Sequence, residues 1–207
     1  MRAERNRCPG RVLRYIALMQ IWTGLGNPGP RYAMHRHNVG FMAVDVIGDM
    51  HGFGPVQKKF SGWVQEGRIG PSKVLLLKPA TFMNESGRSV GEAMRFYKLE
   101  PDALTVFHDE LDLAPFKVKV KQGGGTAGHN GLRSIDKHLG SDFRRVRIGI
   151  GHPGHKDRVT GHVLGNYAKA EMDDLAATLG AMAAEAEWLA AGDGARFMSD
   201  VALRLQG

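Results

Sequence analysis

The chain has 207 residues, of which 43% are hydrophobic and 24% are charged, values that suit a single soluble domain with a sizeable core. No apolar run approaches the roughly 20 residues that a membrane-spanning helix requires, so we expect no membrane partner. The single cysteine, Cys8, excludes an internal disulfide framework and a cysteine-ligated zinc site, and it makes a reducing cytoplasm the expected location.

Charge is distributed unevenly along the chain. Residues 116–160 contain ten Lys or Arg against three Asp, a net charge of +7. Residues 161–207 contain three Lys or Arg against seven Asp or Glu, a net charge of −4. A basic middle beside an acidic tail predicts one surface that faces a polyanion, although an ordinary solvated basic face would give the same counts.

Residues 1–18 differ from the rest in composition. They carry five Arg and one Glu, and they precede a second methionine, Met19. Their apolar stretch continues directly into GLGNPG and lacks the small-residue cleavage site of a signal peptide. A transit peptide is one alternative. We expect a disordered extension or a mis-assigned start codon, and we assign the catalytic domain to residues 19–207.

The periodicity of apolar residues predicts the elements in chain order. Residues 20–25 form a short strand that ends in a glycine-rich turn, and Asn38 is placed to cap a helix over about 39–50. Segments 62–69 and 73–79 predict a hairpin. The later elements are a helix at 84–99, a buried strand at 103–113, a lysine-alternating antiparallel strand at 116–122, a glycine loop feeding a helix at 123–140, a strand at 143–151, and alanine-rich helices at 169–190 and 194–205.

Together these elements predict one α/β domain. Strands interleaved with helices, with both parallel and antiparallel pairing, give three layers: a twisted mixed β-sheet surrounded by α-helices. We find no internal repeat and no linker that would divide residues 19–207.

Two segments, 24–29 and 123–128, match the dinucleotide-binding pattern G-x-G-x-x-G. That pattern binds pyrophosphate when a helix begins inside it. Pro28 and Pro30 delay the first helix by about a dozen residues, and the second match follows a strand that is not continuously apolar. We therefore expect no nicotinamide cofactor.

The segment GRSVG at 87–91 matches the nucleophile elbow G-x-S-x-G, and Ser89, Asp109 and His129 occur in the chain order of a hydrolase triad. The elbow requires a sharp turn directly after a strand, whereas Ser89 falls inside a helical periodicity. We interpret Ser89 as a helix-surface residue rather than a nucleophile.

A metal site is a second alternative. His35 and His37 with His108, Asp109 and Glu110 supply imidazole and carboxylate ligands of the kind that metals bind. His108 and Glu110 flank Asp109 and would point away from it in a continuing strand, so a metal-dependent hydrolase ranks behind a metal-free site.

Polar residues gather at strand ends or in adjoining loops, where open α/β sheets place ligands. They are Asn27, His37, Asn38, Asn84, Asp109 and Asn130. Each asparagine by itself also fits an ordinary turn or helix cap. Asp109 ends a buried strand and needs a partner. A histidine is suitable, because a carboxylate fixes the tautomer of the ring and supports its positive charge.

Five segments together resemble the successive signature segments of bacterial peptidyl-tRNA hydrolases: GLGNPGPRYAMHRHNVGF, KPATFMNESG, HDELDL, GGGTAGHNGLRSI and RVRIGIGHPG. The resemblance covers roughly residues 20–190 in order. It implies a monomer, without metal or other cofactor, that cleaves the ester between a peptide and the 3′ end of tRNA and so frees the tRNA for reuse. Its partner would be peptidyl-tRNA, bound at the acceptor stem and 3′ end.

Carried over to this sequence, the resemblance implies that His37 is the catalytic base and that Asp109 orients it. It places Asn27 and Asn84 near the peptide and ester, and Asn130 against substrate or water. It further implies Tyr32 and Met83 as contacts of the 3′-terminal nucleotide or peptide, Lys121 and Arg147 as contacts of the tRNA phosphates, and residues 152–168 as a helical lid.

The parts suit the chemistry. Asparagine amides can donate hydrogen bonds to the oxyanion of an ester under attack, and a basic surface can hold many tRNAs through phosphate charge and shape. The chain departs from the family pattern at His35, where threonine is usual, and in residues 1–18. We expect His37 rather than His35 to be the base, because a cap at Asn38 would fix the backbone of His37. The alternatives are a serine- or metal-dependent esterase and an RNA-binding protein without turnover.

Overall fold

The computed structural model describes residues 19–206. Over this range the sheet has seven strands in the order β2-β3-β4-β1-β5-β7-β6. Their bounds are β1 Met19–Gly24, β2 Gln57–Lys59, β3 Gly62–Ile69, β4 Ser72–Pro79, β5 Leu104–Glu110, β6 Val118–Gln122 and β7 Arg144–Gly149. β1 is parallel to β4 and β5, and β5 is parallel to β7, whereas β2–β3, β3–β4 and β6–β7 pair antiparallel. The predicted fold class, a mixed sheet in a single domain, is confirmed.

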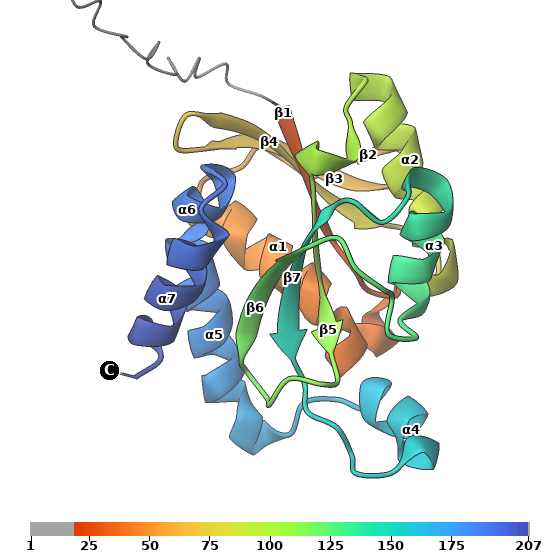
Figure 1. Cartoon of the computed structure of the whole chain (residues 1–207), viewed down its shortest axis with the longest axis vertical. Coiled ribbons are helices and arrows are strands. Elements are labelled where there is room, and N and C mark those ends of the chain that lie inside the picture. The colour runs from red at the N-terminus through yellow and green to blue at the C-terminus, as the bar shows by residue number, and fades with distance from the viewer. Residues whose placement is uncertain (1–18, 207) are drawn as a thin grey trace, which may run out of the picture.

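Helices cover both faces of the sheet (Figure 1). They are α1 Val39–Met50, α2 Ser86–Tyr97, α3 Asn130–Leu139, α4 Val159–Val163, α5 Met172–Ala184, α6 Ala186–Ala190 and α7 Gly194–Arg204. Adjacent strand residues face opposite sides. Trp22 packs with α1, α5, α6 and α7, while Ile21 packs with α2 and α3. These two apolar clusters form the predicted three layers.

The hairpin, the helix beginning at residue 39 and the antiparallel strand at the end of the sheet are confirmed. Strand β2 was not predicted, because its three residues, 57–59, are all exposed and carry no apolar pattern. The helix expected from residue 84 begins at Ser86, after a single 3₁₀ turn. The helix expected over 169–190 is divided into α5 and α6 at Glu185.

The N-terminus of α1 lies against the ends of two central strands. A Cβ atom on Gly40 would sit 2.2 Å from the carbonyl oxygen of Phe107 in β5 and 2.5 Å from the backbone nitrogen of Leu25, so no larger residue fits there. This close approach places the residues just before α1, including His37, beside the C-terminal end of β5.

Asn38 has a different role from the one predicted. It precedes α1, but its side chain makes no capping hydrogen bond. Its Oδ1 accepts from the backbone nitrogen of Asn27 at 2.9 Å, and its Nδ2 donates to the carbonyl of Asn27 at 3.0 Å. The prediction of a side-chain cap was wrong, because the buried amide (2% exposed) has both of its ends bonded to the backbone of Asn27 instead. Asn38 still fixes the backbone beside His37, by joining it to the loop after β1.

The predicted extension, residues 1–18, lies outside the described residues. Among the helices of residues 19–206, none is both long enough and apolar enough to cross a membrane.

Candidate active site

A cavity of about 310 Å³ lies at the C-terminal end of β5. We call it the central cavity. Three segments far apart in the sequence enclose it together with His37: the end of β5 (108–111), the loop leading into α3 (126–130), and α4 with its flanking residue (159–164). The predicted helical lid, residues 152–168, therefore contains a helix that forms one wall of the cavity.

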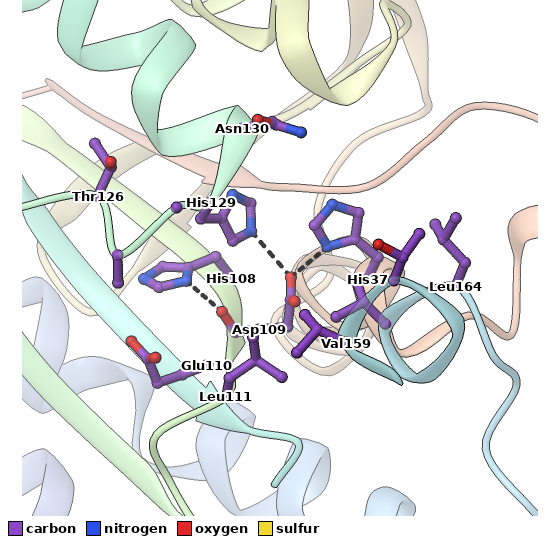
Figure 2. Close-up of a pocket in the computed structure, with 14 residues that line it drawn as sticks. His37, His108, Asp109, Glu110, Leu111, Thr126, His129, Asn130, Val159 and Leu164 are labelled. Carbon is purple, nitrogen blue, oxygen red and sulfur yellow. Dashed lines mark hydrogen bonds and ion pairs between the residues drawn. The ribbon is translucent and has the colours of Figure 1, made fainter. Parts of the chain in front are cut away.

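Asp109 accepts two hydrogen bonds from histidines on its two sides (Figure 2). Its Oδ1 lies 2.9 Å from Nδ1 of His37 and 3.0 Å from Nε2 of His129. The Asp109 side chain is only 4% exposed, so this carboxylate interacts with the two rings rather than with bulk water. The structure thus brings together the predicted pair His37 and Asp109 and adds a second histidine.

The neighbours of His129 determine which of its nitrogens carries the proton. His129 is the N-cap of α3, and the backbone N–H groups of Gly131 and Leu132 donate to its Nδ1 at 3.1 and 3.4 Å. A nitrogen that accepts must be unprotonated, so Nε2 carries the hydrogen and donates it to Asp109. The carboxylate likewise accepts from Nδ1 of His37, which leaves Nε2 of His37 with a lone pair.

Asp109 is held in its charged form. Burial by itself would raise its pKa, but the positive charge that His37 and His129 carry when protonated, with their hydrogen bonds to the carboxylate, outweighs burial and holds the pKa well below its usual range. An ionised acid at this position can stabilise a positive charge that forms on either ring.

His129 was not predicted as a site residue. In the sequence it entered only as a member of the triad pattern with Ser89. The residue that follows it, Asn130, was interpreted on its own as an ordinary turn residue. In the structure the imidazole is the cap. A histidine immediately before the first helical residue, in a loop that faces an acid, is the signal that would have indicated it.

The three predicted asparagines lie around this centre. Asn130 lines the central cavity and also a second groove, between α2 and α3, where Asn84 lies. Asn27 lines a third groove, beside α1. Its Oδ1 accepts from the backbone nitrogen of Met83 at 3.0 Å, which orients the amide and directs its Nδ2 donor elsewhere.

The two residues predicted to contact the 3′-terminal nucleotide or peptide, Met83 and Tyr32, differ in how far they are exposed. Met83 is only 5% exposed and packs in the core, where its sulfur lies against Gly131 at the start of α3. Its side chain therefore exposes little surface for the expected direct contact with the substrate. Tyr32 is half-buried, and its ring meets the ring of His35 edge-on at 5.3 Å between centroids.

The predicted phosphate contacts lie on the β6–β7 ribbon. Lys121 is exposed on β6, and Arg147 lies on β7. Register pairs Lys119 with Arg147 and Lys121 with Arg145, so all four basic side chains share one face of the ribbon. Arg147 is not free, however: its Nε donates to Glu110 at 2.8 Å.

The sequence offered two alternative sites, a serine nucleophile at Ser89 and a metal site, and the structure treats them differently. Ser89 is not at the helix surface as predicted: it is fully buried in α2 against Gly62, away from the residues that line the central cavity. The apolar core rather than solvent covers that face of the helix, and a buried hydroxyl there cannot act as a nucleophile in the cleft.

A metal-ligand set of the predicted kind is present in altered form. Within residues 19–206, His37, Asp109 and His129 form one group whose ligand atoms lie within 4.8 Å of one another. His108 and Glu110 do not join it, because His108 bonds to a backbone carbonyl and Glu110 pairs with Arg147. A metal on Nε2 of His129 would require that nitrogen to give up its proton to Nδ1, which would break the cap of α3. The geometry therefore favours hydrogen bonding over coordination.

His108 is a buried neutral base, and it leads to a prediction about stability. Its Nδ1 donates to the carbonyl of Asp109 at 2.6 Å, and burial, with repulsion from His129 when that ring is protonated, lowers its pKa from 6.5 to about 3. Between these two pH values the unfolded chain binds a proton at His108 that the folded chain does not bind. Stability should therefore fall as pH drops from 6.5 towards 3, with a contribution approaching about 1.4 kcal/mol per pH unit.

His108→Asn removes this titration and keeps a donor for the carbonyl. Its free energy of unfolding, measured in urea from pH 4 to 7, should depend less steeply on pH than that of the parent chain. Parallel curves for the two proteins would contradict the assignment.

Comparison with known proteins gives the family. The family model described as peptidyl-tRNA hydrolase matches residues 21–206. The chain belongs to the peptidyl-tRNA hydrolase family. Among curated relatives, the peptidyl-tRNA hydrolase of Erythrobacter litoralis is 80% identical over 188 residues, covering 91% of this chain and 100% of the relative. That of Novosphingobium aromaticivorans is also 80% identical, covering 91% and 98%.

Solved structures agree. The crystal structure of peptidyl-tRNA hydrolase from Acinetobacter baumannii superposes with a TM-score of 0.83 at 41% identity, covering 88% of this chain and 94% of the other. As a member of this family, the chain is an enzyme that hydrolyses peptidyl-tRNA and releases free tRNA for reuse. The predicted activity and substrate are confirmed, and the alternative of an RNA-binding protein without turnover is set aside.

Proposed function

We propose that His37 is the general base of this hydrolysis and that Asp109 orients it. The observation that carries the proposal is the 2.9 Å contact between Nδ1 of His37 and Oδ1 of Asp109. It fixes the ring so that its other nitrogen points away from Asp109, towards the side of the cavity where Asn130 lies (Figure 2). Geometry of this kind matters more for a general base than the value of its pKa.

The reaction balances with these groups. A water molecule loses a proton to Nε2 of His37 while its oxygen attacks the ester carbonyl. Amide N–H groups of the predicted residues Asn27, Asn84 and Asn130 are available to donate to the oxyanion that forms. The imidazolium, supported by Asp109, then returns the proton to the ribose oxygen as the carbon–oxygen bond breaks, leaving a peptide acid and a tRNA hydroxyl.

A single assay tests the metal-free base mechanism. Purified protein is given an N-acetylaminoacyl-tRNA, and release of the blocked amino acid is followed in EDTA and, separately, after treatment with a serine-directed fluorophosphonate. Both treatments should leave turnover unchanged. Inactivation by EDTA with recovery on adding zinc would favour the His37–Asp109–His129 group as a metal centre, and inactivation by the fluorophosphonate would indicate a serine nucleophile.

Lys121 and Arg147 are proposed to hold tRNA phosphates, with Tyr32 near the 3′-terminal nucleotide. Lys121→Ala should raise KM and make it less sensitive to salt while sparing kcat, because phosphate contacts position a substrate. Lys73→Ala is the matched control, since it removes the same charge from an exposed position on β4. A fall in kcat at saturating substrate, or an equal change in both variants, would show that Lys121 has another role.

We further propose that residues 19–207 carry the activity, as a monomer in the cytoplasm. The family match begins at residue 21, and the extension lacks the apolar periodicity needed for docking. A chain beginning at Met19 should therefore keep its melting temperature and its turnover at physiological salt. Light scattering at assay concentration should give the mass of one chain, and a large loss on truncation would place residues 1–18 within the functional unit.

A further inference from the structure

The third groove, beside α1, lies next to the active centre. It has a volume of about 430 Å³ and lies where the start of α1 faces the beginning of β3 and the end of β4. We call it the α1 groove. The residues that matter here are Asn27, Ala33, Phe41, Met42, Val56 and Trp63, with the ion pair Asp45–Lys78.

The surface of the α1 groove is apolar and electrically neutral. Nζ of Lys78 lies 2.5 and 2.7 Å from the two carboxylate oxygens of Asp45 and 5.7 Å from the ring centroid of Phe41. The cation is therefore already paired with a carboxylate and an aromatic face. A phosphate backbone, which binds through unpaired basic side chains, finds no such partner here.

The groove between α2 and α3 has the opposite character. Arg88, Arg133 and Lys137 line it against a single acid, Glu85, which leaves an excess of positive charge. It shares Asn130 with the central cavity. A polyanion would therefore bind at the basic groove between α2 and α3 in preference to the neutral α1 groove.

The α1 groove begins next to the proposed base. Asn27 and Asn38 are among its lining residues and are joined by two hydrogen bonds, and Asn38 directly follows His37 in the chain. The substrate of this enzyme has two unlike parts on the two sides of its ester, a polyanionic RNA and a peptide. Charge assigns the RNA to the basic surfaces and leaves the neutral, apolar groove for the peptide.

We propose that the α1 groove binds the peptide portion of the substrate, through residues that precede the esterified one, and that it favours apolar side chains. The proposal rests on the proposed function of His37, because it takes the ester to lie beside that ring. Peptide specificity then resides in Phe41, Met42, Val56 and Trp63, outside the groups that perform the chemistry.

Val56 provides the test, because its side chain is 57% exposed and charged substitutions there should not disturb folding. Val56→Glu and Val56→Lys are compared on tetrapeptidyl-tRNAs that carry either Lys or Glu before the esterified residue. Val56→Glu should favour the Lys peptide in kcat/KM by about two- to fivefold, the size of a surface ion pair, and Val56→Lys should favour the Glu peptide to a similar extent. Leu203→Glu and Leu203→Lys, at a position 63% exposed on α7, are the controls and should show no preference.

An N-acetylaminoacyl-tRNA separates the proposal from its premise. It presents one residue and an acetyl group, so both Val56 variants should cleave it as the parent does. Variants that ignore peptide sequence would overturn the proposal. So would a Val56→Lys that improves every substrate, the short one included, since the groove would then face RNA. A wrong assignment of the base would instead show as a His37→Ala variant that still cleaves the short substrate.

Discussion

Replacement of His37 by alanine is expected to lower kcat by about 10²–10⁴-fold, the range for loss of a positioned general base. The ring supplies the lone pair that accepts the proton of the attacking water, and Asp109 can still bond to His129 in the variant. The fold should survive, because the hydrogen bonds that seat the start of α1 come from Asn38 and the backbone. The measurement is single-turnover release of N-blocked amino acid at saturating tRNA substrate, with a melting curve for each protein.

His35→Ala is the matched control. His35 lies two residues away, but its ring packs against Tyr32 rather than against Asp109, and it is not among the residues that line the central cavity. Its removal should leave kcat nearly unchanged, with at most an effect on KM through Tyr32. If His35→Ala were the inactive variant, or if added zinc restored His37→Ala, the metal-free base mechanism would be wrong.

Local patterns in the sequence predicted the framework well. The alternation of Val and Lys in residues 118–121 indicated a half-exposed antiparallel strand, and the structure confirms it as β6. Pro28 and Pro30 indicated a delayed first α-helix, and the structure confirms that it starts at Val39. Such features depend on neighbours in the chain, so a single sequence contains the information.

Contacts between distant side chains were predicted less well. Asn38 bonds to Asn27, Glu110 pairs with Arg147, and His129 bonds to an acid 20 residues before it. Each of these residues has an ordinary local role open to it as a cap, a solvent-exposed charge or a turn residue. Which role it takes depends on the sheet order that brings β5 beside β7 and on the packing of α1 against β1 and β5, and residue spacing does not encode that arrangement.

Asp109→Asn should also lower kcat, by a factor within about 10²–10⁴. The amide oxygen can still accept a hydrogen bond from Nδ1 of His37, so ring position is largely kept. The negative charge that stabilises the imidazolium is lost. The site favours that charge in the parent protein, because its two histidines lower the pKa of Asp109. Glu110→Gln is the matched control: it neutralises the neighbouring acid of the same cavity, which pairs with Arg147 and not with His37. Equal losses in kcat would mean that cavity charge, not orientation of His37, limits the reaction.

His129→Ala completes the comparison, because it asks which of the two rings on Asp109 is the base. In the neutral ring of His129 the backbone N–H groups of Gly131 and Leu132 occupy Nδ1, and Nε2 carries the proton donated to Asp109. No lone pair is left to take a proton from water, so kcat should fall less than in His37→Ala, with some loss of stability from the missing cap of α3. Asp109→Asn should add little to the loss already present in His37→Ala, since residues that act as one unit are not additive. If His129→Ala were the more damaging change in kcat while its melting temperature held, Asp109 would be orienting the other histidine, and the roles of the two rings would have to be exchanged.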